Sequence, residues 1–99
     1  MVRATLYMTV KAGREEEFQQ AWRSIAAQAK QAAGNVRQAL LRDPQNPSTF
    51  ILTSDWESRD HFTRFERSPE QDELTAPLRE LRESAKMTVY DLIDHVEGT

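Results

Sequence analysis

Residues 2–10 read Val-Arg-Ala-Thr-Leu-Tyr-Met-Thr-Val, and this alternation of apolar and polar side chains is the pattern from which the fold can be worked out. Successive side chains of a β-strand point to opposite faces, so the pattern predicts a strand with one buried face. The buried face would carry Ala4, Leu6, Met8 and Val10, and the other face Arg3, Thr5, Tyr7 and Thr9. Gly13 ends the strand, and the glutamates at 15–17 suit the positive end of a following helix.

A long helix is predicted after these glutamates. Its apolar residues recur at spacings of three and four and form one stripe, made of Phe18, Trp22, Ile25, Ala29 and Ala32. We expect Gly34 to end this helix as a C′ residue. Residues 36–42 and 50–56 are predicted as two strands of an antiparallel hairpin, joined by a loop whose two prolines cannot donate ladder hydrogen bonds.

The second half of the chain predicts two shorter helices and a last strand. Ser58 can cap a helix that carries His61, Phe62 and Phe65, and the sequence Ser-Pro-Glu-Gln at 68–71 is typical of the start of another. Pro77 is expected to break or kink that third helix. We interpret the charged run 79–83 as a solvated helix face, and residues 85–93 as the last strand.

Four strands and two main helical regions in this order favour an α+β fold. We predict the ferredoxin-like β-α-β-β-α-β arrangement, in which an antiparallel four-stranded sheet carries all helices on one face and residues 1–99 form a single domain. The other face would carry Tyr7, Ala39, Leu41 and Ile51. Apolar sheet surface of this extent is rarely left in water, so we predict a homodimer in which two sheets pack back to back.

Composition and charge restrict the classes of partner. The chain has 99 residues, of which 38% are hydrophobic and 29% charged, with a net charge of -3 and a pI of about 5.4. A nucleic-acid partner is not expected, because a broad basic surface is missing. A membrane partner is not expected either, because the apolar runs are far shorter than the roughly 20 residues of a membrane span. The sequence contains no cysteine, which agrees with the cytoplasm, where we place the protein.

The sequence does not predict a metal or cofactor site. The two histidines, His61 and His95, lie on different elements, and neither has a second ligand at metal-binding spacing. A Gly-rich phosphate loop, a nucleophile elbow and a dinucleotide fingerprint are also missing from the sequence. We therefore predict no metal and no cofactor.

Seven aromatic residues are spread over strands and helices that we expect to face one interior. They are Tyr7, Trp22, Phe50, Trp56, Phe62, Phe65 and Tyr90. Core packing accounts for most aromatic residues in such positions. The functional alternative is an apolar pocket between sheet and helices, which binds a flat aromatic ligand and orients it with a few polar groups. His61 can exchange protons near neutral pH beside Phe62, and its alternative is a solvent-exposed helix histidine.

Two segments resemble the antibiotic biosynthesis monooxygenase family. They are residues 8–18, Met-Thr-Val-Lys-Ala-Gly-Arg-Glu-Glu-Glu-Phe, and residues 54–62, Ser-Asp-Trp-Glu-Ser-Arg-Asp-His-Phe, followed by Ser-Pro at 68–69. The resemblance implies a dimeric α/β barrel with a pocket between each sheet and its helices. For some members it implies oxidation of phenolic polyketides to quinones by molecular oxygen, without metal, flavin or haem. The function it implies here is a cofactor-independent monooxygenase acting on a phenolic aromatic polyketide or a similar phenol.

The residues and the resemblance together give a predicted site. We predict His61 and Trp56 as catalytic residues, and the predicted substrate-binding residues are Trp56, Phe62, Phe65, Tyr7, Trp22 and Tyr90. The resemblance to members of the actinorhodin pathway places an Asn and a Tyr where this chain has Leu52 and Phe62, so only Trp56 carries over. The group that moves the proton stays open among His61, Asp55, Tyr7 and Tyr90.

Other functions remain open at this point. The resemblance to haem-degrading relatives places their Asn, Trp and His at Leu6, Phe65 and Thr75, so haem degradation is rejected. A non-oxidative binder or cyclase of aromatic polyketides would use the same architecture and pocket. An effector-binding or purely structural dimer is a third alternative. Oxygen uptake with a phenolic polyketide separates the first function from the others.

Overall fold

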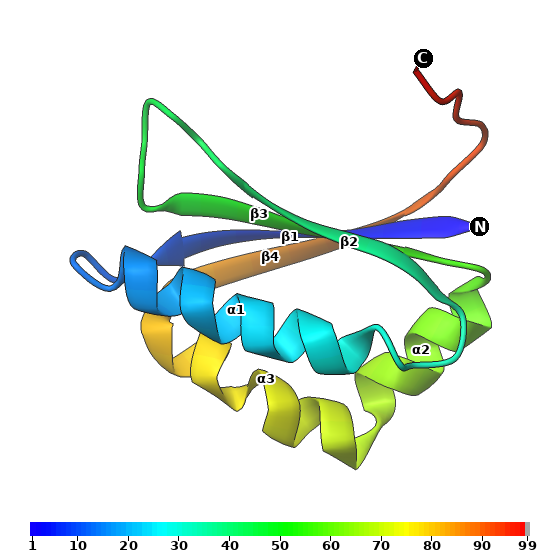
Figure 1. Ribbon diagram of the computed structural model, residues 1–99, viewed down its shortest axis with the longest axis horizontal. Helices are drawn as coiled ribbons and strands as arrows, with labels where there is room; N and C mark the ends of the chain where they lie inside the picture. The colour runs from blue at the N-terminus through cyan, green and yellow to red at the C-terminus, as the bar shows by residue number, and fades with distance from the viewer. Residues whose placement is uncertain (99) are drawn as a thin grey trace.

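The computed structural model describes residues 1–98 and shows a four-stranded sheet with its helices packed on one side (Figure 1). In chain order the elements are β1 (Val2–Val10), α1 (Glu15–Ala29), β2 (Asn35–Arg42), β3 (Thr49–Trp56), α2 (Arg59–Arg67), α3 (Pro69–Leu81) and β4 (Arg82–Asp91). The sheet order is β2-β3-β1-β4, and every neighbouring pair is antiparallel. The predicted α+β, ferredoxin-like arrangement is confirmed, with the second helical region divided into α2 and α3.

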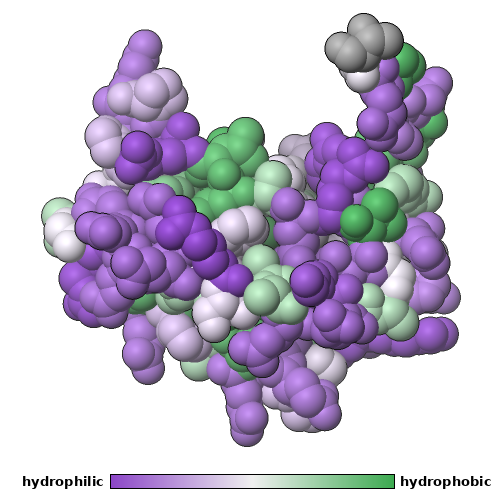
Figure 2. All heavy atoms as spheres, viewed as in Figure 1, coloured by the Kyte–Doolittle hydropathy of each residue, from purple (hydrophilic) through white to green (hydrophobic). Residues whose placement is uncertain are grey.

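The face of the sheet that carries no helix is called the open face below. It carries the odd-numbered residues 3–9 of β1, 37–41 of β2 and 51–55 of β3, and the even-numbered residues 84–90 of β4. Tyr7 pairs with Ile51, and Ile51 pairs with Leu41, so these apolar side chains form one row across three strands as predicted. Figure 2 shows apolar surface above the sheet, between the β2–β3 loop and the C-terminal segment, on a mainly hydrophilic molecule.

The other face of the sheet packs against the helices in two adjoining clusters. One cluster contains Phe18 and Phe50, whose ring centroids lie 5.2 Å apart, and it is closed by leucines of α3. The second cluster is built around Trp56 and Phe62. The alternation of β1 supplies both clusters, because its even-numbered residues all point to this side.

The helix α1 ends at Ala29, so the prediction that it continues to Gly34 is wrong. Residues 31–33 follow the Lys30 cap, and Gly34 lies in the turn that leads into β2. Gly34 has φ +84°, and a Cβ there would overlap the ring of His61. Glycine is therefore required for both backbone conformation and space, but at the entry to a strand instead of at a helix C′ position.

Both predicted caps are present. The Ser58 hydroxyl accepts a hydrogen bond from the His61 amide, and the Ser68 hydroxyl accepts one from the Gln71 amide. The expected break at Pro77 is absent, since α3 continues past it to Leu81. β4 consequently starts at Arg82, three residues earlier than predicted. Within residues 1–98, none of the helices is long and apolar enough to cross a bilayer.

Candidate functional site

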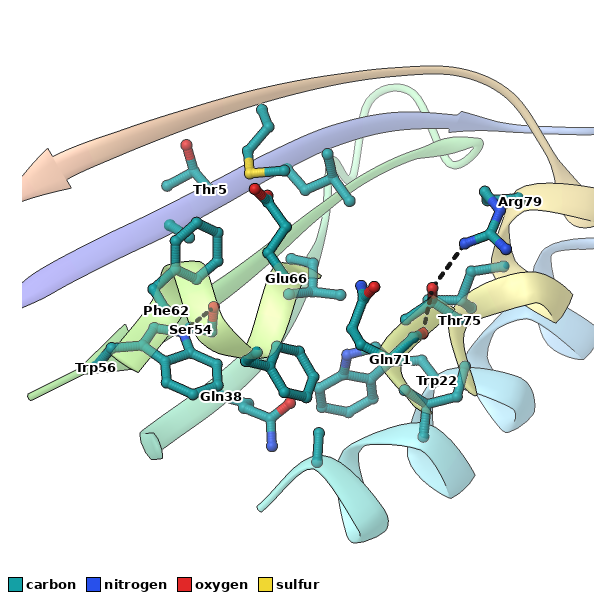
Figure 3. Close-up of a pocket in the computed structure, with 18 of the residues that line it drawn as sticks. Thr5, Trp22, Gln38, Ser54, Trp56, Phe62, Glu66, Gln71, Thr75 and Arg79 are labelled. Carbon is teal, nitrogen blue, oxygen red and sulfur yellow. Dashed lines mark hydrogen bonds between the residues drawn. The ribbon is translucent and has the colours of Figure 1, made fainter. Parts of the chain in front are cut away.

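A cavity of about 190 Å³ lies between the sheet and the helices, and its walls are mainly apolar. The residues that line it are Ala4, Thr5, Leu6, Trp22, Ile25, Ala29, Gln38, Leu52, Ser54, Trp56, Phe62, Phe65, Glu66, Gln71, Thr75, Leu78, Arg79, Arg82 and Met87. Figure 3 shows aromatic rings gathered around this space from α1, α2 and β3. The predicted pocket between sheet and helices is therefore present.

Trp56 forms a fixed part of the cavity wall. Its side chain is 1% exposed, and its ring centroid lies 5.0 Å from that of Phe65 and 5.9 Å from that of Phe62. The indole N–H donates a hydrogen bond to the buried hydroxyl of Ser54 at 3.0 Å. Because that N–H already has a partner, Trp56 contributes an aromatic surface to the cavity, and its ring is held in one orientation.

Trp22 reaches the same cavity from α1, but its polar atom is not satisfied. The indole nitrogen is buried, and it has no hydrogen-bond partner among residues 1–98. Buried donors are nearly always paired in folded proteins, so an unpaired one in a cavity wall needs an explanation. The two tryptophans of the chain therefore differ: one presents a satisfied ring to the cavity, and the other a free donor.

The polar part of the cavity comes mainly from one side of α3 and from the start of β4. Gln71, Thr75 and Arg79 follow one another at helical spacing, with Arg79 Nη1 2.8 Å from Thr75 Oγ1 and Thr75 Oγ1 2.9 Å from the Gln71 carbonyl oxygen. Arg79 was missed because we interpreted 79–83 as a solvated helix face, and Gln71 was interpreted only as part of a helix start. The four-residue spacing 71, 75, 79 was the signal that could have found them.

Two arginines place positive charge at this end of the cavity. Arg79 lies 3.4 Å from the exposed Asp72 carboxylate, whereas Arg82 has no ion pair within residues 1–98. Burial, together with the neighbouring Arg79, lowers the pKa of Arg82 from its ordinary value. A guanidinium stays protonated in proteins, so Arg82 is a partly buried cation that lacks a protein counter-ion. Among the residues that line the cavity, Glu66 supplies a carboxylate, and its side chain is exposed at the rim.

Four of the predicted site residues meet in the cavity, and the others lie elsewhere. Trp22, Trp56, Phe62 and Phe65 line it, whereas Phe50 packs in the core against Phe18. The expectation that Tyr7 and Tyr90 face the same interior is wrong. They are 49% and 53% exposed on the open face, because Tyr7 alternates with the inward-pointing Leu6 and Met8, and Tyr90 pairs with Arg3.

His61 is placed outside this cavity. It lines a separate pocket with Arg64 and Ser68, and its Nδ1 lies 2.7 Å from the Ser58 hydroxyl. Ser58 caps the start of α2 and contacts the imidazole, which packs against Gly34 at the entry to β2. The structure therefore does not bring the two predicted catalytic residues, His61 and Trp56, to one cavity.

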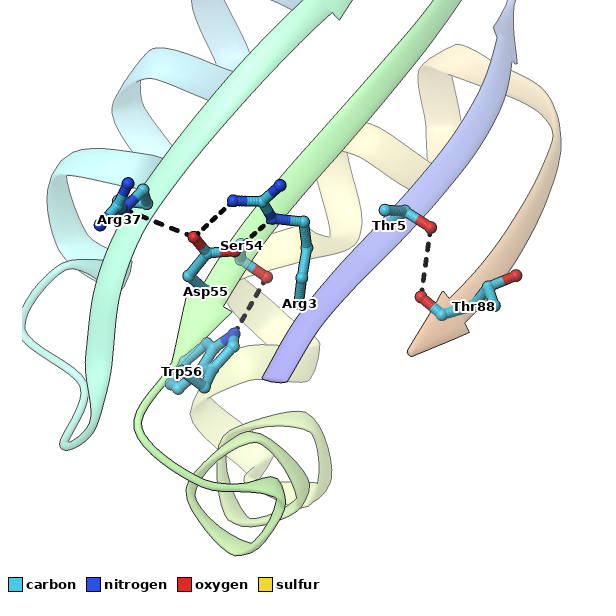
Figure 4. Close-up of polar contacts among 7 residues, drawn as sticks. All are labelled: Arg3, Thr5, Arg37, Ser54, Asp55, Trp56 and Thr88. Atoms are coloured by element: carbon cyan, nitrogen blue, oxygen red, sulfur yellow. Dashed lines mark hydrogen bonds and ion pairs between the residues drawn. The ribbon is translucent and has the colours of Figure 1, made fainter. Parts of the chain in front are cut away.

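Asp55, the other predicted candidate for proton transfer, lies on the open face. Arg3 holds it with two hydrogen bonds of 2.6 and 2.9 Å, and Arg37 Nε lies 3.4 Å from its second oxygen (Figure 4). The hydrogen bonds from Arg3 keep the pKa of Asp55 below its ordinary value, against the effect of its burial. Asp55 is thus a paired carboxylate separated from the cavity by the sheet. Across residues 1–98, no group of three or more His, Cys, Asp or Glu side chains is arranged to hold a metal ion.

Comparison with known proteins identifies the family. The family "Antibiotic biosynthesis monooxygenase" matches residues 1–77. The chain belongs to this family. Among curated relatives of this monooxygenase-family chain, the 42.8 kDa protein in the whiE locus of Streptomyces coelicolor is 28% identical over 97 residues, covering 98% of the chain and 24% of that protein. Protein SchA of Streptomyces halstedii is 27% identical over 77 residues, covering 78% of the chain and 20% of its own length.

A solved structure of the same fold is SnoaB from Streptomyces nogalater, described as a cofactor-independent oxygenase. It superimposes on the chain with a TM-score of 0.86 at 23% identity, covering 98% of this chain and 97% of that one. The superposition shows that the two share a fold. The chain spans about a quarter or less of the length of the two curated relatives, the whiE-locus protein and Protein SchA.

Proposed function

We propose that the cavity binds a flat phenolic compound of the aromatic polyketide class, and that the protein oxidises it to a quinone with molecular oxygen and without a cofactor. The observation that carries the proposal is a mainly apolar cavity walled by Trp22, Trp56 and Phe65 in a chain of the monooxygenase family. Cavities of this make-up bind flat apolar ligands and orient them with a few polar groups. SnoaB, with the same fold, supports the cofactor-independent form of the reaction.

The proposed reaction balances without an external reductant. The phenol loses two hydrogens, one from its hydroxyl group and one from the ring carbon that is attacked. That carbon gains one atom of dioxygen and becomes the second carbonyl of the quinone, and the other oxygen atom leaves as water with the two hydrogens. All electrons that reduce dioxygen come from the substrate, so the protein's tasks are to bind, to orient and to favour the phenolate.

The charged residues of the cavity suit those tasks. Positive charge from Arg79 and Arg82 favours the phenolate over the neutral phenol. Glu66 lies at the rim and is the group we propose to accept the proton and pass it to solvent, in place of His61, which lies outside the cavity. Trp56, held by Ser54, is proposed as the rigid aromatic surface against which the substrate ring lies.

A non-oxidative binder or cyclase is the second candidate. Two apolar lining residues, Leu52 and Phe62, favour this candidate. The resemblance to members of the actinorhodin pathway places a polar Asn and Tyr at these two positions. Such a protein would bind the same ligands in the same cavity but would not consume oxygen.

We also propose that the protein works as a homodimer in the cytoplasm. The row formed by Tyr7, Leu41 and Ile51 supports pairing through the open face, since Tyr7 and Leu41 are 49% and 48% exposed in the single chain. Covering such a row with the same row of a second copy would remove it from water.

Oxygen uptake with anthrone tests the proposed function, because anthrone is a simple fused-ring compound whose oxidation to anthraquinone consumes one O₂ per molecule. The purified protein should consume oxygen well above the rate of buffer alone, and a chelator should leave the rate unchanged.

Leu52→Phe fills the cavity and should lower kcat/KM at least tenfold. The matched control is Leu40→Phe, the same change at the cross-strand partner of Leu52, which packs in the core without lining the cavity. Rates equal to buffer alone would leave only the binding function.

A further inference from the structure

The orphaned N–H of Trp22 carries an inference about how a ligand is oriented. This nitrogen belongs to a residue that lines the cavity, is itself buried and has no hydrogen-bond partner in residues 1–98. A buried donor that has lost water without gaining an acceptor destabilises the protein that contains it. Its presence is explained if a ligand supplies the acceptor, since the cost is then recovered each time the ligand binds.

The neighbouring polar groups sharpen this explanation. The amide of Gln38 already donates to the Ala26 carbonyl oxygen, and the N–H of Trp56 already donates to Ser54. The side-chain amide of Gln71 lines the cavity and has no hydrogen bond within the described residues. Figure 3 shows the Trp22 indole nitrogen and the Gln71 amide turned toward the same part of the cavity, well apart from Trp56.

We propose that the Trp22 N–H, with the Gln71 amide of the same cavity, binds an oxygen atom of the aromatic ligand, either a carbonyl or a phenolate oxygen. The oxygen-bearing end of the ligand then lies between α1 and α3, and its hydrocarbon rings lie against Trp56 and Phe65. An unsubstituted aromatic hydrocarbon would enter the same cavity but gain nothing from this donor. The inference rests on the proposed function only in placing an aromatic ligand in the cavity.

The chain contains two tryptophans, so its ¹H–¹⁵N spectrum has two indole N–H peaks, and Trp22→Phe assigns them. The probes are 1,4-naphthoquinone, which carries acceptor oxygens, and naphthalene, which has the same rings without them. Thiol adducts of the quinone are excluded because the chain has no cysteine. The quinone should move the Trp22 peak downfield, as a new hydrogen bond does, and naphthalene should not. The Trp56 N–H stays bonded to Ser54, and the rings of both probes lie against Trp56, so ring currents should move its peak by a similar amount with both. The Trp56 peak is therefore the internal reference for the movement of the Trp22 peak that only the quinone produces.

Affinity gives an independent readout. Trp22→Phe should weaken naphthoquinone binding about fivefold to tenfold, the loss expected for one hydrogen bond, and change naphthalene binding less than twofold. If the variant does not fold, the difference between the two probes in the wild-type spectrum still decides the matter, with Trp56→Phe used for assignment.

Three results would overturn the inference. They are equal movement of the Trp22 peak with both probes, equal loss of affinity for both in the variant, and no binding of either probe. The outcome is separable from that of the oxygenase proposal. A Trp22 response in a protein that does not consume oxygen would keep this inference and refute the oxygenase, whereas quinone binding without that response would refute this inference alone.

Discussion

Trp56→Phe should destabilise the protein by an amount that the structure allows to be worked out. The side chain is 1% exposed, so the smaller ring leaves a void between β3 and α2, which costs about 1–2 kcal/mol. The indole also donates to Ser54 Oγ at 3.0 Å, and losing this bond inside the protein costs about 1 kcal/mol more. The free energy of unfolding should therefore fall by roughly 2–3 kcal/mol, which lowers the Tm by about 10–20 °C in a chain of this size.

Thermal and urea unfolding, followed by circular dichroism, measure this loss. Ser54→Ala is the companion variant, and it should cost about 1–2 kcal/mol because it leaves the indole N–H buried and unpaired. The double variant should be no less stable than Trp56→Phe alone, since both partners of the bond are then gone. A Trp56→Phe protein within about 0.5 kcal/mol of the wild type would refute the packing argument. If Trp56 also supports the substrate ring, oxygen uptake by the folded variant should fall at least tenfold, or about 1.4 kcal/mol, and wild-type turnover would leave it a purely structural residue.

Three further predictions concern charge and assembly. Asp55→Asn should lower the free energy of unfolding by roughly 2 kcal/mol in chemical denaturation, because Arg3 and Arg37 lose their shared carboxylate; no change would contradict the pairing. Because its pKa is lowered in the folded state, the stabilisation by Asp55 should be complete above about pH 4 and disappear as the pH falls through the folded pKa, so the variant should show a flatter acid limb. Ile51→Asp should convert the proposed dimer to monomers in light scattering, and an unchanged dimer mass would rule out the open face as the interface. Glu66→Gln should lower kcat for anthrone about a hundredfold with little change in Tm, and a wild-type kcat would exclude Glu66 as the proton acceptor.

Much of the fold followed from periodicity, because each element buries one face. The alternation in β1 assigned every side chain to its side of the sheet, and the stripe of α1 put Trp22 on the cavity side. The hydroxyls of Ser58 and Ser68 marked two helix starts correctly, since a cap is a local hydrogen bond that depends on few neighbours.

The errors came where tertiary contacts decide. Gly34 signals a left-handed backbone, but which turn uses it depends on the His61 ring packed against it, and this is not visible in the local sequence. Pro77 fits inside α3, where the turns on either side of it pack against α1 and the sheet. Tyr90 was placed in the pocket on its aromatic character alone, whereas the pairing register with β1 decides which face it occupies.

The polar half of the cavity was the largest omission. Charged and amide residues on a helix are usually solvated, so Gln71 and Arg79 gave no signal beyond their spacing. That spacing acquires meaning only after α3 is seen to lie over the sheet beside α1 (Figure 1). Likewise, the orphaned N–H of Trp22 is a property of the packed structure, because every exposed indole can find water.

The most direct test of the proposed function follows the oxygen atoms. Anthrone is incubated with the purified protein under ¹⁸O₂ in ordinary water, and the anthraquinone formed is analysed by mass spectrometry, with Leu52→Phe and buffer alone as controls. The reaction proposed above predicts one ¹⁸O atom in each molecule of product, formed faster than in either control and without added flavin, metal or reductant. Anthraquinone formed at the rate of buffer alone, or only after flavin and reductant are added, would contradict it.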